Sequence, residues 1–403
     1  MNLFRVGLFE VLASFRMIAL VLLLLHQPLG GVAAPVSCYN DDGGAVDWFY
    51  LYKLPRGRSH GEGLKYLFME RGSEGWTEGK GLVNDSTGAL AKTLGPLYED
   101  NELAYILYND QPPKTQTDAK DEEVGSGHTK GVVLFDQTQG FWLVHSTPLF
   151  PPAKSKGPYS YPSSGMINGQ NFLCVTYPLE HFQTIGDQLQ INQPRVYDCH
   201  IPASLASSVP SLQELCRQNQ RENASVSTHH SHISSANRSI ALTSLAGTQF
   251  ISFAKGADFQ NDLYHSWVAP TLQSDLLVQF WRRTRGVLPS DCTLGWKVLD
   301  IQLVSPGQGY TYRATQDHSK WAVSPNAAAW GGAGSGSGWV CVGDINRDRA
   351  EERRGGGTVC LQDPVVWKAY RAAALRCYSC KGVVSDCGTA VREMELQGQT
   401  TGH

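Results

Sequence analysis

The sequence lacks the features by which several common classes of protein are recognised. After residue 34, no apolar stretch is long enough to cross a membrane as a helix. The glycines at 355–357 are not followed by Lys-Ser/Thr, which excludes the phosphate-binding loop of many nucleotide-dependent enzymes. The sequence also has no helix-turn-helix, zinc finger or basic helix. Sequence-specific reading of DNA bases is therefore not expected.

A strong net charge is also missing. The 403 residues carry a formal charge of −3 at pH 7, so the composition does not indicate a nucleic-acid-binding protein at neutral pH. The 12 histidines change this conclusion in acid, because protonation of all of them would bring the net charge to +9. A hydrophobic content of 41% is ample for a large core and indicates two domains or one two-lobed body.

The N-terminus has the pattern of a secretory leader. Arg5 and Arg16 precede the apolar run 17–25, and small residues at 30–34 suit cleavage near Ala33 or Ala34. The apolar run is short for a membrane span, so residues 1–34 are interpreted as a signal peptide, with an uncleaved anchor as the alternative.

A secretory protein is expected to carry glycans and disulfides. Glycosylation sequons start at Asn84, Asn223 and Asn237. Ten cysteines indicate disulfide bonds, and the proximity of Cys199 and Cys216 favours their pairing. Cys377-Tyr-Ser-Cys380 has no matching Cys or His pair nearby, so no zinc site is expected.

Residues 221–238 are rich in Ser, Asn and His, including His229, His230 and His232. A metal site there is conceivable, but a glycosylated surface linker is the preferred interpretation, because His-rich tracts in polar loops are usually solvated. The predicted organisation is an N-terminal lobe at 35–220, this linker, a C-terminal lobe at 239–380 and a tail at 381–403.

The strongest chemical signal is a His-x-Lys pattern that occurs twice, as His128-Thr-Lys130 and His318-Ser-Lys320. Side chains at i and i+2 of an extended segment point to the same side, so each copy presents an imidazole beside an ammonium group. The ammonium can hold a phosphate oxygen while the imidazole attacks phosphorus or donates a proton. Two copies facing one cleft would form a phosphodiesterase site that needs neither metal nor cofactor.

The surroundings of the two motifs repeat as well. An apolar strand, a turn and a Trp-containing strand follow His128, and the same succession with a longer Gly-rich insertion at 327–338 follows His318. Strands are expected at 46–53, 103–108, 171–177, 239–244, 249–254, 276–282 and 297–305. Helices are expected at 178–190, 208–220, 257–274 and 361–376.

Several further blocks occur together with these motifs in a distinctive order: Cys38-Tyr39, 46–49, 52–55, 107–113, 127–131, 141–146, 242–244, 278–281, 317–321, 342–344 and 354–358. In these blocks the sequence resembles the deoxyribonuclease II family over roughly 36–376. The resemblance implies an α/β fold of the phospholipase D-like kind, a pseudo-dimer of two lobes with one His-x-Lys motif each. It also implies metal-independent cleavage of double-stranded DNA in acid, leaving 3′-phosphate and 5′-hydroxyl ends.

The resemblance assigns roles to individual residues. His318 matches the principal catalytic histidine, His128 its partner, and Lys130 and Lys320 the phosphate-holding lysines. His145, Asp344 and Asn346 are candidates for orienting the histidines, with a structural role as the alternative. The resemblance also implies the disulfides Cys38–Cys174, Cys341–Cys360 and Cys292–Cys380, and leaves Cys377 and Cys387 paired or free.

The sequence departs from the parent superfamily in one respect. That superfamily places an Asp seven residues after each His, where this chain has Phe135 and Pro325. The orienting carboxylate must come from elsewhere, and Asp344 is the preferred candidate. Two other functions stay open, namely a secreted phosphodiesterase acting on lipid and a non-catalytic DNA-binding scavenger. The expected location is the lysosome, reached through the secretory pathway, with secretion as the alternative and no stable membrane association.

Overall fold

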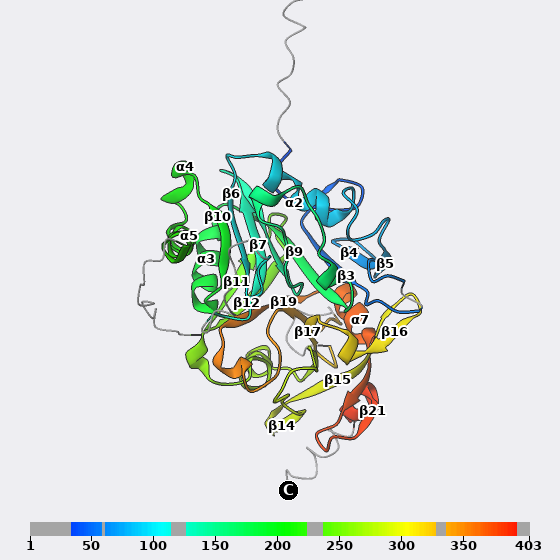
Figure 1. The fold of residues 1–403 in the computed structure, drawn as a ribbon. Helices are drawn as coiled ribbons and strands as arrows, with labels where there is room; N and C mark the ends of the chain where they lie inside the picture. The colour runs from blue at the N-terminus through cyan, green and yellow to red at the C-terminus, as the bar shows by residue number, and fades with distance from the viewer. Residues whose placement is uncertain (1–33, 59–60, 114–125, 224–236, 328–335, 393–403) are drawn as a thin grey trace, which may run out of the picture. The chain divides into compact units, whose positions relative to one another are not determined.

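The computed structural model describes residues 34–392 except 59–60, 114–125, 224–236 and 328–335 (Figure 1). The predicted leader, the histidines at 229–232 and most of the Gly-rich insertion lie outside the described residues. Among the described residues, no helix is both long and apolar enough to cross a membrane. Residues from Val36 onward form one compact unit.

Two large sheets dominate this unit, together with a small two-stranded sheet. The small sheet pairs β1 (Cys38–Tyr39) with β2 (Ala45–Val46). The first large sheet has the order β10-β6-β7-β8-β9-β3-β4-β5 and is antiparallel throughout. Its strands are β3 (Trp48–Lys53), β4 (Tyr66–Glu70), β5 (Thr77–Glu78), β6 (Ala104–Asn109), β7 (Lys130–Phe135), β8 (Gln139–His145), β9 (Gln170–Pro178) and β10 (Val196–His200).

The second large sheet has the order β11-β12-β19-β18-β17-β13-β15-β20-β21, with β14 and β16 also paired to β15. Its one parallel pair is β13 with β15. Its strands are β11 (Arg238–Thr243), β12 (Gln249–Lys255), β13 (Leu276–Gln279), β14 (Asp291–Leu294), β15 (Trp296–Gly307), β16 (Tyr310–Arg313), β17 (Lys320–Val323), β18 (Trp339–Gly343), β19 (Gly356–Gln362), β20 (Ala374–Tyr378) and β21 (Val384–Asp386).

The predicted internal repeat is visible in the strand order. The run β6-β7-β8-β9-β3 of the first sheet corresponds to β13-β17-β18-β19-β12 of the second, and every neighbouring pair in both runs is antiparallel. Each His-x-Lys motif thus leads into the second strand of its run, β7 or β17. The expected mixed α/β fold, with several sheets flanked by helices, is confirmed.

The labelled helices lie beside the sheets (Figure 1). They are α2 (Ala89–Glu99), α3 (His181–Asn192), α4 (Ala203–Ala206), α5 (Pro210–Asn223), α6 (Ala269–Leu272) and α7 (Pro364–Ala373), joined by short helical turns. The expected helix at 257–274 is confirmed only in its second half, because a 3₁₀ turn (Ala257–Phe259) is followed by a separate π-helical turn (Tyr264–Val268) that runs directly into the short α6. The expected helix at 361–376 is wrong at both ends, since β19 runs to Gln362 and β20 starts at Ala374.

The boundary of α7 has a local cause. Asp363 caps the helix, because its side chain accepts hydrogen bonds from the backbone N–H groups of Val365 and Val366. Pro364 fills the first helical position, where no backbone N–H is needed. The preceding segment Val359–Leu361 favours a strand, so β19 continues to Gln362 and the helix begins only after the Asp363 cap.

One hydrophobic core joins the two sheets. Side chains alternate along each strand, so Val133 and Phe135 of β7 and Trp321 and Val323 of β17 belong to the same cluster. Helices α3, α5 and α7 complete that cluster. The opposite face of the first sheet packs with α2 in a second cluster, and that of the second sheet packs with α6 in a third. The two copies of the repeat are consequently held in a fixed relation by shared burial.

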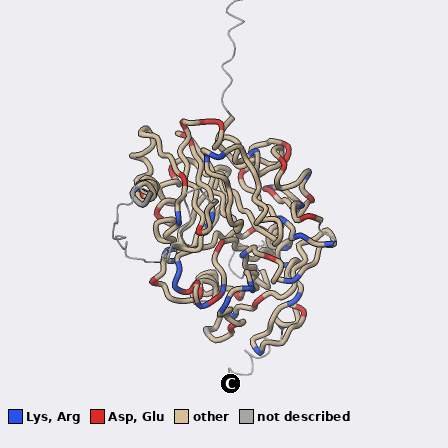
Figure 2. Tube along the Cα trace, viewed as in Figure 1, with Lys and Arg blue, Asp and Glu red and all other residues tan. Residues whose placement is uncertain are grey.

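Charged residues of both signs are interspersed along the chain, in keeping with the nearly balanced net charge (Figure 2). Asn84 and Asn237, the first and third predicted glycosylation sites, have exposed side chains. Asn223, the second, is the last residue of α5.

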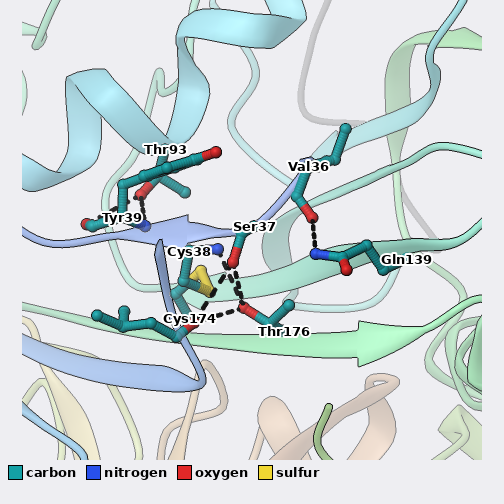
Figure 3. The surroundings of a disulfide bond; sticks show 9 residues. Val36, Ser37, Cys38, Tyr39, Thr93, Gln139, Cys174 and Thr176 are labelled. Atoms are coloured by element: carbon teal, nitrogen blue, oxygen red, sulfur yellow. Dashed lines mark hydrogen bonds between the residues drawn. A yellow bond between two sulfur atoms is a disulfide. The ribbon is translucent and has the colours of Figure 1, made fainter. Parts of the chain in front are cut away.

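Five disulfides bridge the described chain. The first ties the N-terminal segment to β9, where Ser37 and the backbone of Cys38 also bond Thr176 Oγ1 and Gln139 bonds the carbonyl of Val36 (Figure 3). The fifth resolves the pairing that the sequence left open and links β20 to the segment after β21. The pairs are Cys38–Cys174, Cys199–Cys216, Cys292–Cys380, Cys341–Cys360 and Cys377–Cys387.

Candidate active site

The two His-x-Lys motifs occupy equivalent places in the two copies. Lys130 and Lys320 are the first residues of β7 and β17, and each histidine lies two residues earlier, just outside its strand. Both lysines are fully buried, His128 is 6% exposed, and His318 is half-buried. Each motif leads into a central strand, so the backbone pairing of β7 and β17 with their neighbours fixes where the imidazoles lie.

His318 is held by a neutral partner from the other copy. Its Nδ1 lies 2.8 Å from the backbone carbonyl oxygen of Ser146, at the end of β8. Because a carbonyl can only accept, Nδ1 carries the proton and Nε2 keeps its lone pair. Lys320 Nζ lies beside the ring, 3.1 Å from Nδ1 and 3.4 Å from Nε2. The ring of Trp281 packs against the imidazole at 5.2 Å between centroids.

His128 instead faces two carboxylates. Its Nδ1 lies 2.6 Å from Glu351 Oε1, and its Nε2 lies 3.7 Å from Asp110 Oδ2. Arg354 bridges the two acids, with its guanidinium 3.4 Å from Asp110 and 3.8 Å from Glu351. This environment can stabilise a positive charge on the His128 ring.

The two histidines therefore differ in proton affinity. Burial, followed by the charges of Lys320, Lys130 and His128, holds the pKa of His318 well below 6.5. Burial also lowers the pKa of His128, but Glu351 and Asp110 oppose that shift. His318 is accordingly the imidazole that stays neutral in acid, and His128 is the one that can carry a proton.

The two lysines also have different partners. Lys130 forms a buried ion pair with Asp110, whose pKa this charge helps to lower. Lys320 has no carboxylate ion pair within the described residues; burial and the charge of Lys130 lower its pKa to about 7. At acid pH, the Lys320 ammonium is charged and is not neutralised by a carboxylate, so it can form a charged hydrogen bond to an incoming phosphate oxygen.

The three candidate orienting residues make different contacts around the site. Asn346 donates to Glu351 Oε1 at 3.5 Å and accepts from the backbone N–H of Trp281 at 3.1 Å, so it supports the acid beside His128. His145 stacks against Phe172 and accepts from the backbone of Thr147 at Nδ1. His145 is therefore a buried residue packed among the aromatic rings of Phe150 and Phe172.

Within the described residues, the hydrogen bonds of Asp344 go to backbone groups and not to an imidazole. It accepts hydrogen bonds from the backbone N–H groups of Lys130 and Gly357, which join β18 to β7 and β19. The carboxylate beside His128 is Glu351. Burial raises the pKa of Asp344 to about 7. Its hydrogen bonds connect the backbones of the two copies.

Sequence reasoning missed Glu351, Asp110, Arg354 and the Ser146 carbonyl. Asp110 follows β6 inside one of the sequence blocks quoted above, which offered a signal. Ser146 and Arg354 also lie in such blocks, 141–146 and 354–358, whereas Glu351 stands in the charged run 347–354, which has the composition of an ordinary solvated turn. Within the described residues, no group of three or more His, Cys, Asp or Glu side chains is placed to hold a metal ion.

Comparisons with known proteins place this geometry in a family. The profile of the deoxyribonuclease II family matches residues 37–380. The chain belongs to the deoxyribonuclease II family. It is 44% identical to deoxyribonuclease-2-alpha of Rattus norvegicus over 366 residues, which cover 89% of this chain and 98% of the relative.

Alignments with other deoxyribonuclease II relatives cover similar shares of both chains. Deoxyribonuclease-2-alpha of Sus scrofa is 44% identical, with 86% of this chain and 90% of the relative covered. Deoxyribonuclease-2-beta of Homo sapiens is 36% identical, with 90% and 96% covered. The matched region contains both histidines, both lysines and the acids around them, so the whole candidate site lies within the deoxyribonuclease II region of the chain.

Proposed function

We propose that this chain is a metal-independent acid endonuclease that hydrolyses phosphodiester bonds of double-stranded DNA to 3′-phosphate and 5′-hydroxyl ends. The observation that carries the proposal is the pairing of two unlike imidazoles in one site. One is fixed by a neutral carbonyl and the other lies between two carboxylates. The names of the relatives supply DNA as the substrate.

In the first step, Nε2 of His318 attacks phosphorus and the bond from phosphorus to O5′ breaks. The proton on Nδ1 donated to Ser146 keeps Nε2 available as the nucleophile. Protonated His128 gives its proton to the departing O5′, which leaves as the 5′-hydroxyl. The DNA 3′ end remains attached to His318 as a phospho-histidine.

In the second step, His128 acts as a base. It takes a proton from water, the resulting hydroxide attacks phosphorus, and the P–N bond to His318 breaks. The product leaves as a 3′-phosphate, and both imidazoles return to their starting protonation states. Lys320 and Lys130 hold the charged phosphoryl oxygens during both displacements.

The acid requirement follows from the same contacts. The cycle needs His318 neutral and His128 protonated. The depressed pKa of His318 keeps it neutral in acid, while burial makes protonation of His128 depend on low pH. Two imidazoles this close titrate as a coupled pair.

A polyanionic substrate is supported by the surface beside His318. Arg283, Arg285, Arg349 and Arg353 are exposed, and within the described residues none of them forms an ion pair with a carboxylate. Arg283 packs over the Trp281 ring, and the backbone of Arg349 bonds that of Gly286, so the two loops adjoin. Neighbouring Arg282, which is half-buried, and Arg347, which is buried, instead form ion pairs with Asp300.

The same proposal includes the compartment. Five disulfides suit an oxidising, secretory route, and the acid requirement suits the lysosome, with secretion as a second destination. The N-terminal signal peptide and the glycosylation of Asn84, Asn223 and Asn237 belong to this route.

The test is nicking of supercoiled plasmid at pH 5 in EDTA. We expect wild-type protein to nick, and His318→Ala and His128→Ala to lose activity by about a thousandfold or more, as removal of a nucleophile or its proton partner requires. His200→Ala, an exposed histidine at the end of β10, is the matched control and should nick normally. End-labelling of the products should show 3′-phosphates.

Two results would overturn the proposal. Failure of folded, glycosylated wild-type protein to nick would refute the nuclease function. Binding of DNA without cleavage would then favour the scavenger, and hydrolysis of phospholipid vesicles would favour the lipid phosphodiesterase. Equal nicking by wild type and His318→Ala would show that the reacting group lies elsewhere.

A further inference from the structure

Two buried lysines outside the His-x-Lys motifs occupy equivalent places in the repeat. Lys53 is the last residue of β3, and Lys255 is the last residue of β12. Lys53 pairs with Gln170, the first residue of β9, and Lys255 pairs with Gly356, the first residue of β19. The two positions therefore correspond strand by strand between the two copies.

Each ammonium group collects backbone carbonyls from a single loop. Lys53 Nζ donates to the carbonyls of Met166, at 3.1 Å, and Asn168. Lys255 Nζ donates to the carbonyls of Glu351, Glu352 and Arg354, at 2.8, 3.2 and 2.6 Å. The loops are 166–169, which precedes β9, and 351–355, which precedes β19.

These contacts are unusual for lysine. Lys53 is 0% exposed and Lys255 is 1% exposed, and neither makes an ion pair with a carboxylate within the described residues. A buried charge is costly unless hydrogen bonds compensate it, so the carbonyls are what hold each ammonium in place, and the ammonium in turn holds the loop. Burial lowers the pKa of Lys53 to about 7 and that of Lys255 to about 8, so both are charged in acid.

Each clamped loop ends on a glycine that reaches the opposite motif. The carbonyl of Gly169 accepts the backbone N–H of His318, and the carbonyl of Gly355 accepts the backbone N–H of His128, both at 2.8 Å. The approach is too close for a side chain. A Cβ on Gly169 would lie 2.4 Å from Asp317 Oδ1, and one on Gly355 would lie 2.2 Å from the Asn192 carbonyl.

We propose that Lys53 and Lys255 are paired positioning residues, each of which fixes the histidine of the opposite copy through the loop that it holds. This inference deepens the proposed function and rests on it for the roles of the histidines. Lys53 acts on His318 alone. Lys255 acts on His128 twice, because its loop carries both Gly355 and Glu351, the acid at His128 Nδ1.

The first test is amide hydrogen exchange of Lys53→Gln and Lys255→Gln, which keep much of the buried volume and an N–H donor but remove the charge. In Lys53→Gln, exchange of the His318 amide should accelerate about tenfold or more while the His128 amide is unchanged. In Lys255→Gln, the pattern should reverse. Acceleration confined to the copy that carries the substitution, or equal acceleration at both histidines, would overturn the inference.

A measurement on wild-type protein covers the case in which a variant does not fold. In low denaturant, the His318 amide should exchange together with the 166–169 loop, as one opening unit, and the His128 amide together with the 351–355 loop. Exchange of each histidine with the strands of its own copy would contradict the proposal. Neither exchange experiment needs nuclease activity, so failure of the proposed function would leave this result readable.

Kinetics then separates positioning from general loosening of the fold. With a p-nitrophenyl phosphodiester, the leaving group needs no acid, so impaired His128 should still allow His318 to be phosphorylated but slow the release by water. Lys255→Gln should give a burst of about one p-nitrophenolate per enzyme and then turnover at least tenfold slower than wild type. Lys53→Gln should give slow release without a burst. Identical kinetics of the two variants would refute the crossed assignment.

Discussion

The residues around the two imidazoles divide the chemistry between them. A carbonyl beside Nδ1 of His318 fixes a tautomer but adds no charge, whereas a carboxylate beside Nδ1 of His128 favours the imidazolium form. Identical motifs thus acquire different roles from their neighbours. In the proposed mechanism, the nucleophile and the acid are distinguished by contacts that lie in neither motif.

Glu351→Gln tests this division at a single residue. Glu351 raises the pKa of His128, so its neutralisation should lower that pKa further. The general acid must be protonated, so activity is present below its pKa, and the alkaline limb of the kcat/KM profile should move to lower pH. At pH 5, we expect kcat for plasmid nicking to fall about ten- to a hundredfold.

Glu352→Gln is the matched control. Glu352 is the next residue along the chain and is only half-buried, and in the described structure His128 faces Glu351 and Asp110 instead. Its pH profile should coincide with that of the wild type. An unmoved alkaline limb in Glu351→Gln would remove Glu351 from the account of His128.

At the scale of elements, loops at the ends of strands build the site. The loops at 281–288 and 347–354 adjoin through backbone pairing of Val287 with Asp348 and of Arg349 with Gly286. Acidic Asp348 is buried and bonded to backbone N–H groups, while Arg283, Arg285, Arg349 and Arg353 face solvent. These four arginines and half-buried Glu352 leave a net positive surface beside His318.

The double variant Arg283→Gln/Arg349→Gln tests whether this surface holds DNA. Each lost phosphate contact should reduce the slope of log affinity against log salt concentration by about 0.9. We expect KM for duplex DNA at low salt to rise about three- to tenfold, with a smaller change in kcat. Nicking rates measured from 50 to 200 mM salt check both quantities.

The control carries the same change of charge elsewhere. Arg217→Gln/Arg376→Gln replaces exposed arginines on α5 and β20, outside the two loops. It should keep the wild-type KM and salt slope. If both double variants behave alike, the effect comes from net charge and the loop surface is not a DNA contact.

At the scale of the whole molecule, the two copies are joined through buried polar groups as well as a common core. Asp344, which directly follows β18, accepts from the backbone of Lys130 on β7, and Asn171 of β9 accepts from the backbone of Lys320 on β17. Burial raises the pKa of Asp344 to about 7 and that of Asp317 to about 6. Because these groups hold the two copies together, the stability of the whole fold is expected to depend on pH.

Asp344→Asn tests this response. The folded-state pKa of Asp344 lies above its unfolded value near 3.9, so its contribution to stability is complete below that value and is lost as pH rises through about 7. Between pH 5 and pH 8, the wild type should lose on the order of 2 kcal/mol from this group. The variant should lose correspondingly less, as judged by urea unfolding at both pH values.

The variant should also be less stable at pH 5, by about 1 kcal/mol or more. Asp344 accepts from two backbone N–H groups through two oxygens, and an amide would turn its NH₂ group toward one of them. Asp258→Asn, at an exposed position in the second copy, should leave the pH dependence unchanged. Parallel stability curves for Asp344→Asn and wild type would contradict the shifted pKa.

Local pattern was sufficient for much of the fold. Apolar and aromatic runs predicted β3, β7, β8, β9, β12 and β18, which are largely buried on both faces, and the amphipathic segments predicted α3 and α5. The apolar pattern did not predict helix boundaries, because these depend on local backbone preference and on capping residues. The segment 257–274 has apolar residues at helical spacing but forms several short turns, and 361–376 is divided by the Asp363 cap.

The sequence by itself determined the candidate reactive groups, namely two histidines and two lysines whose i, i+2 spacing needs no tertiary contact to bring imidazole and ammonium together. Only the tertiary structure decided which imidazole is neutral and which is flanked by acids. Ser146, Glu351 and Asp110 reach the histidines from loops up to 223 residues away in sequence, and burial shared between the copies changes proton affinities that no local pattern contains. Spacing along a strand is local, whereas charge and desolvation depend on everything that packs around a group.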